Sequence, residues 1–145
     1  MLRVESVNPM LPRLECLRIL LVEDSEDNQQ LFHRILTSAG AQVQIAPNGA
    51  KAIEIFNTAE VLFDLASGQA PFDVIVMDIR MPVVDGYEAT RKIRELGFRG
   101  PIIALTAHAN LGEEERCRSA GCTDFQLKPI DRSRLLSIVS RVTKS

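Results

Sequence analysis

Five side chains that can take part in metal or phosphoryl chemistry stand at or just after the ends of short apolar runs. They are Glu23, Asp24, Asp78, Thr106 and Lys128. If these runs are parallel strands of one sheet, their carboxyl ends meet at a single edge, which is where ligands bind in folds of this kind. The sequence therefore predicts that three acids, a hydroxyl and an amine converge on one site.

Carboxylates gathered in this way repel one another. At a separation of about 4–5 Å and an effective dielectric constant near 20, each pair costs roughly 3–4 kcal/mol. Lys128 supplies only one positive charge, so a divalent metal is expected to balance the rest. All of its protein ligands would be oxygens, which suits Mg²⁺, or Mn²⁺ as the alternative, rather than zinc. A carboxylate beside such an ion, with hydroxyl and amine donors nearby, is equipped to attack a phosphoryl group and form an aspartyl phosphate.

The elements that must position these residues alternate between buried strands and amphipathic helices. The apolar runs predict strands at 19–22, 42–46, 74–77, 102–105 and 124–127. Periodicity and stop signals predict helices at 28–39, 49–67, 87–96, 111–120 and 131–143. Strict alternation predicts an α/β domain with a doubly wound parallel sheet and helices on both faces. Five strands favour the flavodoxin-like order 2-1-3-4-5 over the longer doubly wound order.

Composition and charge limit the remaining classes of function. Residues 1–17 lack clear periodicity and are expected to be an N-terminal extension or linker, which leaves 18–145 as the domain. A net charge of −2 predicts no direct binding to nucleic acid or to acidic lipid. There is no apolar run near the roughly 20 residues that span a bilayer, and no signal-peptide pattern, so we expect a cytoplasmic protein.

Four blocks of the sequence resemble the signature blocks of bacterial response-regulator receivers. They are ILLVEDSEDN, VIVMDIRMPVVDGYEATRKIR, IIALTAHA and FQLKPI. The resemblance covers about residues 18–142 and is strongest to receivers attached to hybrid histidine kinases. Position 23 carries Glu where the family usually has Asp, a variation that the family tolerates.

This resemblance implies a role for each residue of the predicted site. Asp78 would accept a phosphoryl group from a phosphohistidine on a histidine kinase or a histidine phosphotransfer protein. Thr106 and Lys128 would contact the phosphoryl oxygens. Mg²⁺ would be held by Glu23, Asp24, Asp78 and the backbone carbonyl of Arg80. The family also implies a cis peptide bond between Lys128 and Pro129.

The resemblance further implies a switch, in which phosphorylation draws Thr106 inward and Phe125 rotates into the space it leaves. The changed surface would be read by partners and allows a phosphorylation-dependent dimer. Such a domain assists its own phosphorylation and dephosphorylation but turns over no external substrate, so we do not expect an enzyme. The sequence does not identify the kinase or the output, nor whether the chain acts alone or within a hybrid kinase.

Two alternatives belong to other classes of protein. The first is a receiver-fold docking module that works without phosphorylation, which the complete set of acidic, hydroxyl and amine groups disfavours. The second is a phosphatase resembling haloacid dehalogenases, which would need a second acid two residues after its nucleophile. Here Asp78 is followed by Ile79 and Arg80, so the sequence disfavours this class.

Several side chains outside the site are given simpler roles. The long helix at 49–67 carries an apolar stripe that is expected to pack on its own loop, or else to dock a partner. The stripe consists of Ala52, Phe56, Ala59, Phe63 and Ala66. The glutamates at 113–115 are expected to form a solvated helix face, and His33 and His108 to lie at the surface. The three cysteines are expected to be reduced thiols, mostly small packing residues.

Overall fold

The five apolar runs form one parallel sheet with the strand order β2-β1-β3-β4-β5. The strands are β1 (Arg18–Val22), β2 (Gln42–Ala46), β3 (Val74–Asp78), β4 (Ile102–Thr106) and β5 (Asp124–Leu127). This order confirms the flavodoxin-like topology predicted from the sequence. The structure is a computed structural model that describes residues 12–108 and 110–144, so residues 1–11 of the predicted extension lie outside the described part.

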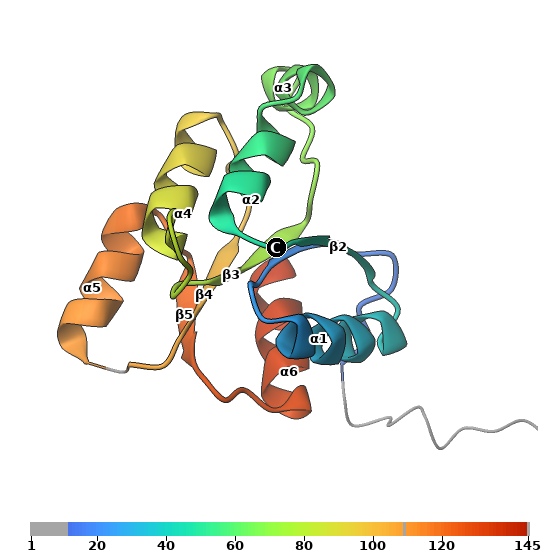
Figure 1. Cartoon of the computed structure of the whole chain (residues 1–145). Helices are drawn as coiled ribbons and strands as arrows, with labels where there is room; N and C mark the ends of the chain where they lie inside the picture. Colours follow the sequence, from blue (N-terminus) through green and yellow to red (C-terminus); the bar gives the residue numbers. More distant parts are fainter. Residues whose placement is uncertain (1–11, 109, 145) are drawn as a thin grey trace, which may run out of the picture.

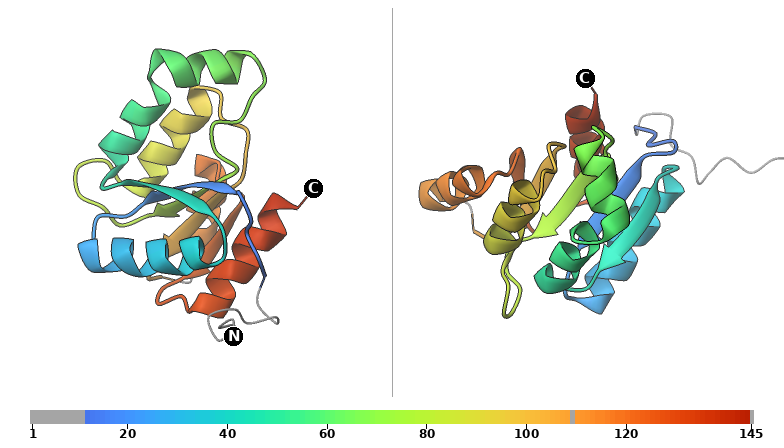
Figure 2. Two further views of the ribbon diagram at one scale, coloured as in Figure 1. Left: turned by 90° about the vertical axis from the view of Figure 1, so that its right-hand side faces the viewer. Right: turned by 90° about the horizontal axis from the view of Figure 1, so that it is seen from above.

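Helices cover both faces of the sheet. In the described part of the chain they are α1 (Glu26–Ser38), α2 (Gly49–Phe56), α3 (Ala59–Ala66), α4 (Gly86–Glu95), α5 (Leu111–Ala120) and α6 (Arg132–Thr143). Figures 1 and 2 show α1 and α6 on one face and α2, α4 and α5 on the other. The predicted doubly wound α/β fold is therefore confirmed.

Side chains of the central strands alternate between two hydrophobic cores. In β1, Leu20 and Val22 belong to the core beneath α2, α4 and α5, whereas Ile19 and Leu21 belong to the core beneath α1 and α6. Strands β3 and β4 alternate in the same way. Because successive side chains of a strand point to opposite faces, burial of both faces explains why these strands are continuous apolar runs.

A side-chain oxygen caps the N-terminus of every helix in the described residues. The capping residues are Ser25, Asn48, Thr58, Asp85, Asn110 and Asp131. Each accepts a hydrogen bond from the backbone N–H three positions ahead, one of the groups that a helix start leaves without a partner. These caps fix where the chain turns from each strand end into the following helix.

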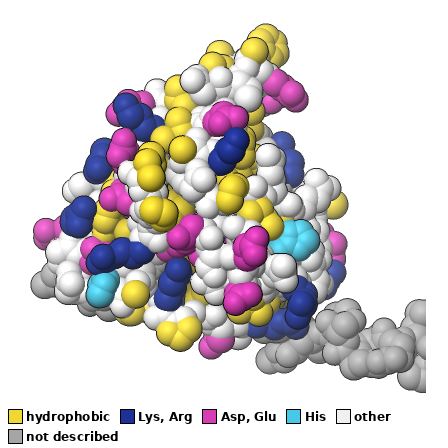
Figure 3. Space-filling view, in the orientation of Figure 1, with side chains coloured by type: hydrophobic (Ala, Val, Ile, Leu, Met, Phe, Trp, Pro, Cys, Tyr) yellow, Lys and Arg dark blue, Asp and Glu magenta, His cyan; other side chains and the backbone are white. Residues whose placement is uncertain are grey.

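The surface mixes charges of both signs. Figure 3 shows acidic and basic side chains interspersed over one face of the molecule. Hydrophobic side chains reach the surface at the top of that view, where α3 lies, and Phe63 of this helix is 70% exposed. None of the helices in the described residues combines the length and hydrophobicity needed to cross a membrane.

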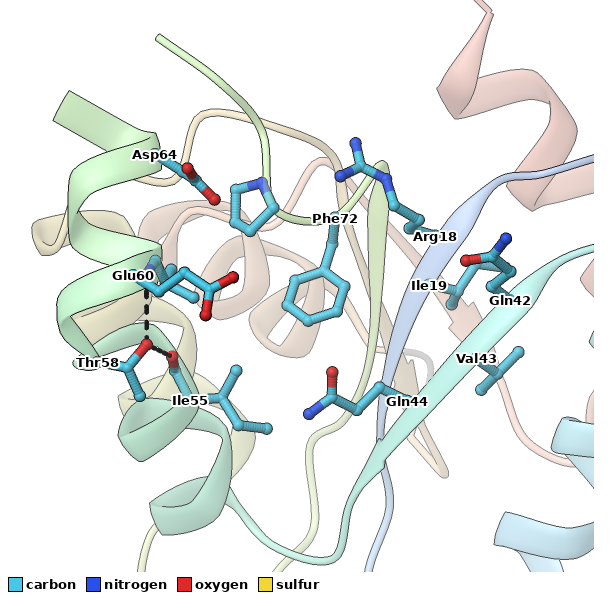
Figure 4. A pocket seen from close by; sticks show the side chains of 12 residues that line it. Arg18, Ile19, Gln42, Val43, Gln44, Ile55, Thr58, Glu60, Asp64 and Phe72 are labelled. Atoms are coloured by element: carbon cyan, nitrogen blue, oxygen red, sulfur yellow. Dashed lines mark hydrogen bonds between the residues drawn. The ribbon is translucent and has the colours of Figure 1, made fainter. Parts of the chain in front are cut away.

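The single helix predicted at 49–67 is wrong, because the chain forms two helices there, α2 and α3. Thr58 separates them: its hydroxyl donates to the carbonyl of Ile55 (3.1 Å) and accepts from the N–H of Val61 (3.3 Å), as the dashed lines in Figure 4 show. The apolar stripe is broken accordingly. Ala52 and Phe56 are buried, but Ala59, Phe63 and Ala66 are exposed, while Val61 and Leu65 pack against the core.

The described end of the predicted extension packs against the domain. Leu14 is buried in the core beneath α1 and α6, and its N–H donates to the carbonyl of Ala39 (2.7 Å). The carbonyl of Leu17 accepts from the N–H of Gln42 (2.7 Å). The boundary at residue 18 stays a prediction, but residues 12–17 include a buried anchor.

The histidines and cysteines lie as the sequence predicts. His33 and His108 are exposed. Cys16 is exposed, Cys117 and Cys122 are buried, and all three are free thiols. None of the three is therefore tied into a disulfide.

Candidate functional site

The register of the sheet brings the predicted site residues to one edge. Val22 of β1 pairs with Met77 of β3, so the residue that follows each of them, Glu23 and Asp78, stands at the same level. Asp78 in turn pairs with Leu105 of β4, and Thr106 comes next. Thr106 pairs with Leu127, after which Lys128 donates its N–H to the carbonyl of Thr106 (2.7 Å).

The three acids form a compact cluster. Glu23, Asp24 and Asp78 each offer a carboxylate oxygen, and these oxygens lie within 4.8 Å of one another. Glu23 and Asp78 are only 1% and 2% exposed, whereas Asp24 is exposed. Two charges are therefore held in the protein interior, where their repulsion is screened less than at the surface.

Lys128 is the cation of the cluster. Its Nζ lies 2.9 Å from Oδ1 of Asp78 and 3.5 Å from Oε1 of Glu23. Burial raises the pKa of Asp78 to about 6, the Lys128 hydrogen bond opposes this rise, and the charge of Glu23 adds to it. Burial alone would lower the pKa of Lys128, but the hydrogen bond and charge of Asp78, together with Glu23, raise it. The peptide bond between Lys128 and Pro129 is cis, as the resemblance implied.

The donor set fits a hard divalent cation. One oxygen of Glu23, Oε2, accepts a hydrogen bond from the N–H of Ser25 (3.1 Å). The other, Oε1, is buried without a hydrogen-bond partner among the described residues. The Nζ of Lys128 lies 3.5 Å from this oxygen but is shared with Asp78. A buried carboxylate oxygen without a hydrogen bond is costly, and an ion coordinated by it would lower that cost. All the available donors are oxygens, as Mg²⁺ prefers.

The backbone at the start of α4 lies in close contact with the backbone that follows Asp78. The N–H of Gly86, at the start of α4, donates to the carbonyl of Ile79 (2.9 Å). A Cβ at Gly86 would stand 2.5 Å from the carbonyl oxygen of Asp78 and 2.7 Å from the Cα of Ile79. Only glycine allows this contact, which holds the strand end that carries Asp78 against the next helix.

The remaining predicted residues lie around this cluster. The N–H of Arg80 donates to Oδ1 of Asp78 (3.2 Å). The Arg80 side chain is 63% exposed, and His108 is exposed. Phe125 of β5 is partly buried against the core beneath α2, α4 and α5, and it pairs with Ala104, two residues before Thr106.

The expected solvated face at 113–115 is wrong for Glu113, which the sequence reading missed as a site residue. Glu113 is 5% exposed, and its Oε1 accepts a hydrogen bond from the hydroxyl of Thr106 (3.0 Å). Its spacing gave a usable signal, because it precedes the buried Cys117 and Ala120 by four and seven positions. Residues with that spacing share one face of a helix.

A groove in the described structure lies away from this cluster. It has a volume of about 570 Å³ and is lined by the starts of β1 and β2, by α3 and by the segment before β3. Figure 4 shows Arg18, Gln42 and Phe72 around it. Arg18 and Gln42 begin their strands and Phe72 precedes β3, so the groove is separate from the acid cluster at the carboxyl ends.

Comparison with known proteins identifies the family. The response regulator receiver domain matches residues 19–140 of this chain, which is most of its length. The protein therefore belongs to the response regulator receiver domain family, whose members serve two-component signalling and are signalling modules rather than enzymes of the usual kind.

Its relatives include both large kinases and small regulators. Probable histidine kinase 2 of rice (Oryza sativa subsp. indica) is 40% identical over 138 residues, which are 90% of this chain but 13% of the rice protein. Two-component response regulator 24 of Arabidopsis thaliana is 35% identical over 87% of this chain and 84% of its own length. This chain thus spans only a small part of the kinase relative but most of the regulator.

A solved structure of similar fold contains a metal. The receiver domain of a sensor histidine kinase from Pseudomonas aeruginosa is 40% identical and superimposes with a TM-score of 0.72, covering 90% of this chain and 99% of that one. A magnesium ion is coordinated in its active site cleft.

Proposed function

We propose that this domain accepts a phosphoryl group on Asp78 and changes its surface in response. The observation that carries the proposal is the position of Asp78. Its carboxylate is 2% exposed, lies in a cluster with two further acids, and is contacted by Lys128 at 2.9 Å. A structural role alone gives no reason to bury two carboxylates, with a third converging on them, beside a single cation.

The proposed reaction is transfer from a phosphohistidine of a histidine kinase or a histidine phosphotransfer protein. A carboxylate oxygen of Asp78 attacks the phosphorus, and the phosphorus–nitrogen bond breaks. The donor imidazole nitrogen keeps the electron pair and takes up a proton from solvent. Lys128 and Thr106 donate to the phosphoryl oxygens, where negative charge accumulates.

The proposed metal ligands are Glu23, Asp24, Asp78 and the backbone carbonyl of Arg80. Bound Mg²⁺ would neutralise the acids and the incoming phosphoryl charge. Glu23 would contribute the oxygen that lacks a hydrogen-bond partner, while Ser25 keeps the other oxygen in place. Mn²⁺ would fit the same oxygen donors.

We further propose that Thr106 and Phe125 form the switch. A phosphoryl group at Asp78 adds strong acceptor oxygens, and Thr106 can move toward them. The face that responds would comprise α5 and β5, which lie between Thr106 and Lys128 in the chain, and α6, which follows Lys128. Partners would read this face, and a phosphorylation-dependent dimer could form on it.

The experiment is phosphorylation by acetyl phosphate with Mg²⁺, followed by intact mass. We expect one added phosphoryl group on the wild-type chain, none on Asp78→Asn, and none in excess EDTA. Asp73→Asn, at the amino end of the same strand, is the matched control and should be labelled normally. Equal labelling of wild type and Asp78→Asn would refute the acceptor. Absence of labelling in the wild type would favour a docking module that works without phosphorylation.

A further inference from the structure

The hydroxyl of Thr106 is already engaged. It donates to Oε1 of Glu113 on α5 (3.0 Å) and accepts from the N–H of His108 (3.2 Å). Thr106 is fully buried and Glu113 nearly so. A hydroxyl has one proton to donate, so Thr106 cannot hold Glu113 and a phosphoryl oxygen at once.

Glu113 faces a second buried hydroxyl. The Tyr87 hydroxyl, on α4, has no hydrogen-bond partner among the described residues. Burial raises the pKa of Tyr87, and nearby Glu113 raises it further. Arg116 of α5 stacks over the Tyr87 ring at 4.2 Å, which keeps the ring between the two helices. The Glu113 carboxylate thus binds the Thr106 hydroxyl, and the Tyr87 hydroxyl lies near enough to influence the pKa of Glu113.

Nearby arginine side chains also stabilise the negative charge of Glu113. The guanidinium of Arg80 lies 3.9 Å from Oε1, the same oxygen that accepts from Thr106. The pKa of Glu113 lies below its ordinary value, with the nearby Tyr87 hydroxyl as the largest cause and the Thr106 hydrogen bond and the charges of Arg80 and Arg116 contributing. An ionised carboxylate accepts stronger hydrogen bonds than a neutral group, which makes the contact with Thr106 a substantial restraint.

We propose that Glu113 is a latch that holds Thr106 in the resting position, and that activation transfers the Glu113 carboxylate from the Thr106 hydroxyl to the Tyr87 hydroxyl. The inference rests on the proposed function, because the competitor for Thr106 is a phosphoryl group on Asp78. Glu113 and Tyr87 lie on α5 and α4, so the exchange would couple the site directly to the packing of these helices. The hydrogen bond between Glu113 and Thr106 opposes activation, whereas the Tyr87 hydroxyl favours activation.

The test is the affinity of the Mg²⁺-loaded protein for fluoroberyllate, a mimic of the phosphoryl group, measured by amide NMR titration. Glu113→Gln and Glu113→Ala should each tighten binding by about three- to tenfold, because a charge-assisted hydrogen bond is about twice as strong as a neutral one. Tyr87→Phe should weaken binding, since Glu113 then has no second hydroxyl to accept from. Before fluoroberyllate is added, the α5 signals of Glu113→Ala should already be displaced toward their wild-type bound positions.

The matched control is Glu114→Gln. This neighbour on α5 pairs with Arg118 at 3.1 Å, so the change removes the same charge without touching Thr106 and should leave the affinity unaltered. A double variant separates the latch from simple charge repulsion. In a Thr106→Ala background, Glu113→Gln should have no further effect.

The outcomes distinguish the two proposals. If wild-type protein neither binds fluoroberyllate nor becomes phosphorylated, the proposed function fails, and the latch fails with it. If wild-type protein responds but neither Glu113 variant binds more tightly, the latch alone is overturned. It is overturned equally if the Thr106→Ala background preserves the full effect of Glu113→Gln. Unfolding by urea identifies any variant that fails to fold, and the second Glu113 variant then decides the result.

Discussion

Charge balance is what constrains the site at the scale of single residues. When ionised, Glu23, Asp24, Asp78 and Lys128 together carry a net charge of −2. Phosphorylation replaces the −1 charge of the Asp78 carboxylate with an acyl phosphate of about −1.5 to −2, which makes the site more negative still. Lys128 is shared between two carboxylates, at 2.9 and 3.5 Å, and cannot offset this sum. A phosphoryl group is therefore expected to bond to Asp78 only after a divalent cation has bound.

The lifetime of the phosphorylated state is expected to depend on Arg80 and His108. Both are bulky and exposed, two positions beyond Asp78 and Thr106, so they can obstruct the in-line approach of water. Replacing both with Ala should shorten the half-life of the acyl phosphate by about tenfold, which corresponds to about 1.4 kcal/mol in the barrier. The decay of the phosphorylated mass with time measures it.

His33→Ala is the control for that change, because His33 is exposed on α1 and should leave the half-life unaltered. An unchanged or longer half-life in the double variant would mean that these side chains do not shield the phosphoryl group.

Residue type and residue position gave conflicting signals in α5. The site residues at strand ends could be predicted, because parallel strands deliver their carboxyl ends to one edge. Glu113 could not be assigned from its type, since glutamate is usually exposed. The spacing of Glu113 from Cys117 and Ala120 indicated that it lies on the buried face of α5. The hydrogen bond that the Glu113 carboxylate accepts comes from Thr106, and this contact depends on how α5 packs against the sheet.

At the scale of elements, capping residues decide where the helices begin. The apolar pattern at 49–67 continues through two helices, so periodicity alone did not reveal the break between α2 and α3. Asn57 and Thr58 did offer a signal, because both residue types compete with helical hydrogen bonds through their own side chains. In the structure, Thr58 uses its side chain to end one helix and to start the next.

The cap at Thr58 should matter for stability and not for chemistry. Thr58→Ala removes the acceptor for the N–H of Val61 and should lower the free energy of unfolding by about 1 kcal/mol. Urea titration measures the change. Labelling by acetyl phosphate should remain at the wild-type rate, because Thr58 borders the groove at the amino ends of the strands.

Thr37→Ala provides the comparison for Thr58→Ala. Thr37 also donates to a backbone carbonyl within its helix, that of His33 (2.7 Å), but it caps no helix start. Its replacement should change stability by less than about 0.5 kcal/mol. Equal effects of the two substitutions would show that Thr58 does not act as a cap.

At the scale of the whole molecule, the fold holds a site whose buried acids lower the stability of the folded protein. Two cores on opposite faces of the sheet bury the apolar side chains of β1, β3 and β4. That burial stabilises the strands up to the point where they end in acids. Burial then raises the pKa of Asp78 from 3.8 to about 6. The ionised carboxylate is thus disfavoured in the folded protein relative to the unfolded chain, where the group has its ordinary pKa.

In the absence of metal, the cost of burying the ionised Asp78 carboxylate is expected to depend on pH. A group with a raised pKa stabilises the fold while it is protonated, and this contribution is lost as the pH rises from about 3.8 to about 6. Asp78→Asn carries no titrating group at that position. In EDTA at pH 7.5 the variant should therefore be more stable than wild type by about 1–3 kcal/mol. The lower end of this range allows for the partner that Lys128 loses in the variant. At pH 5 the difference should be smaller.

Magnesium should reduce the same difference at pH 7.5. A ligand that binds only the folded state stabilises it by about 1.4 kcal/mol at ten times its dissociation constant, and Asp78→Asn lacks one of the proposed ligands. Wild type should therefore gain stability in Mg²⁺ while the variant gains less. Asp27→Asn changes an exposed acid of α1 and should respond to EDTA and Mg²⁺ as wild type does. A wild-type protein more stable than Asp78→Asn in EDTA at pH 7.5 would show that burial of the ionised Asp78 carries no net cost.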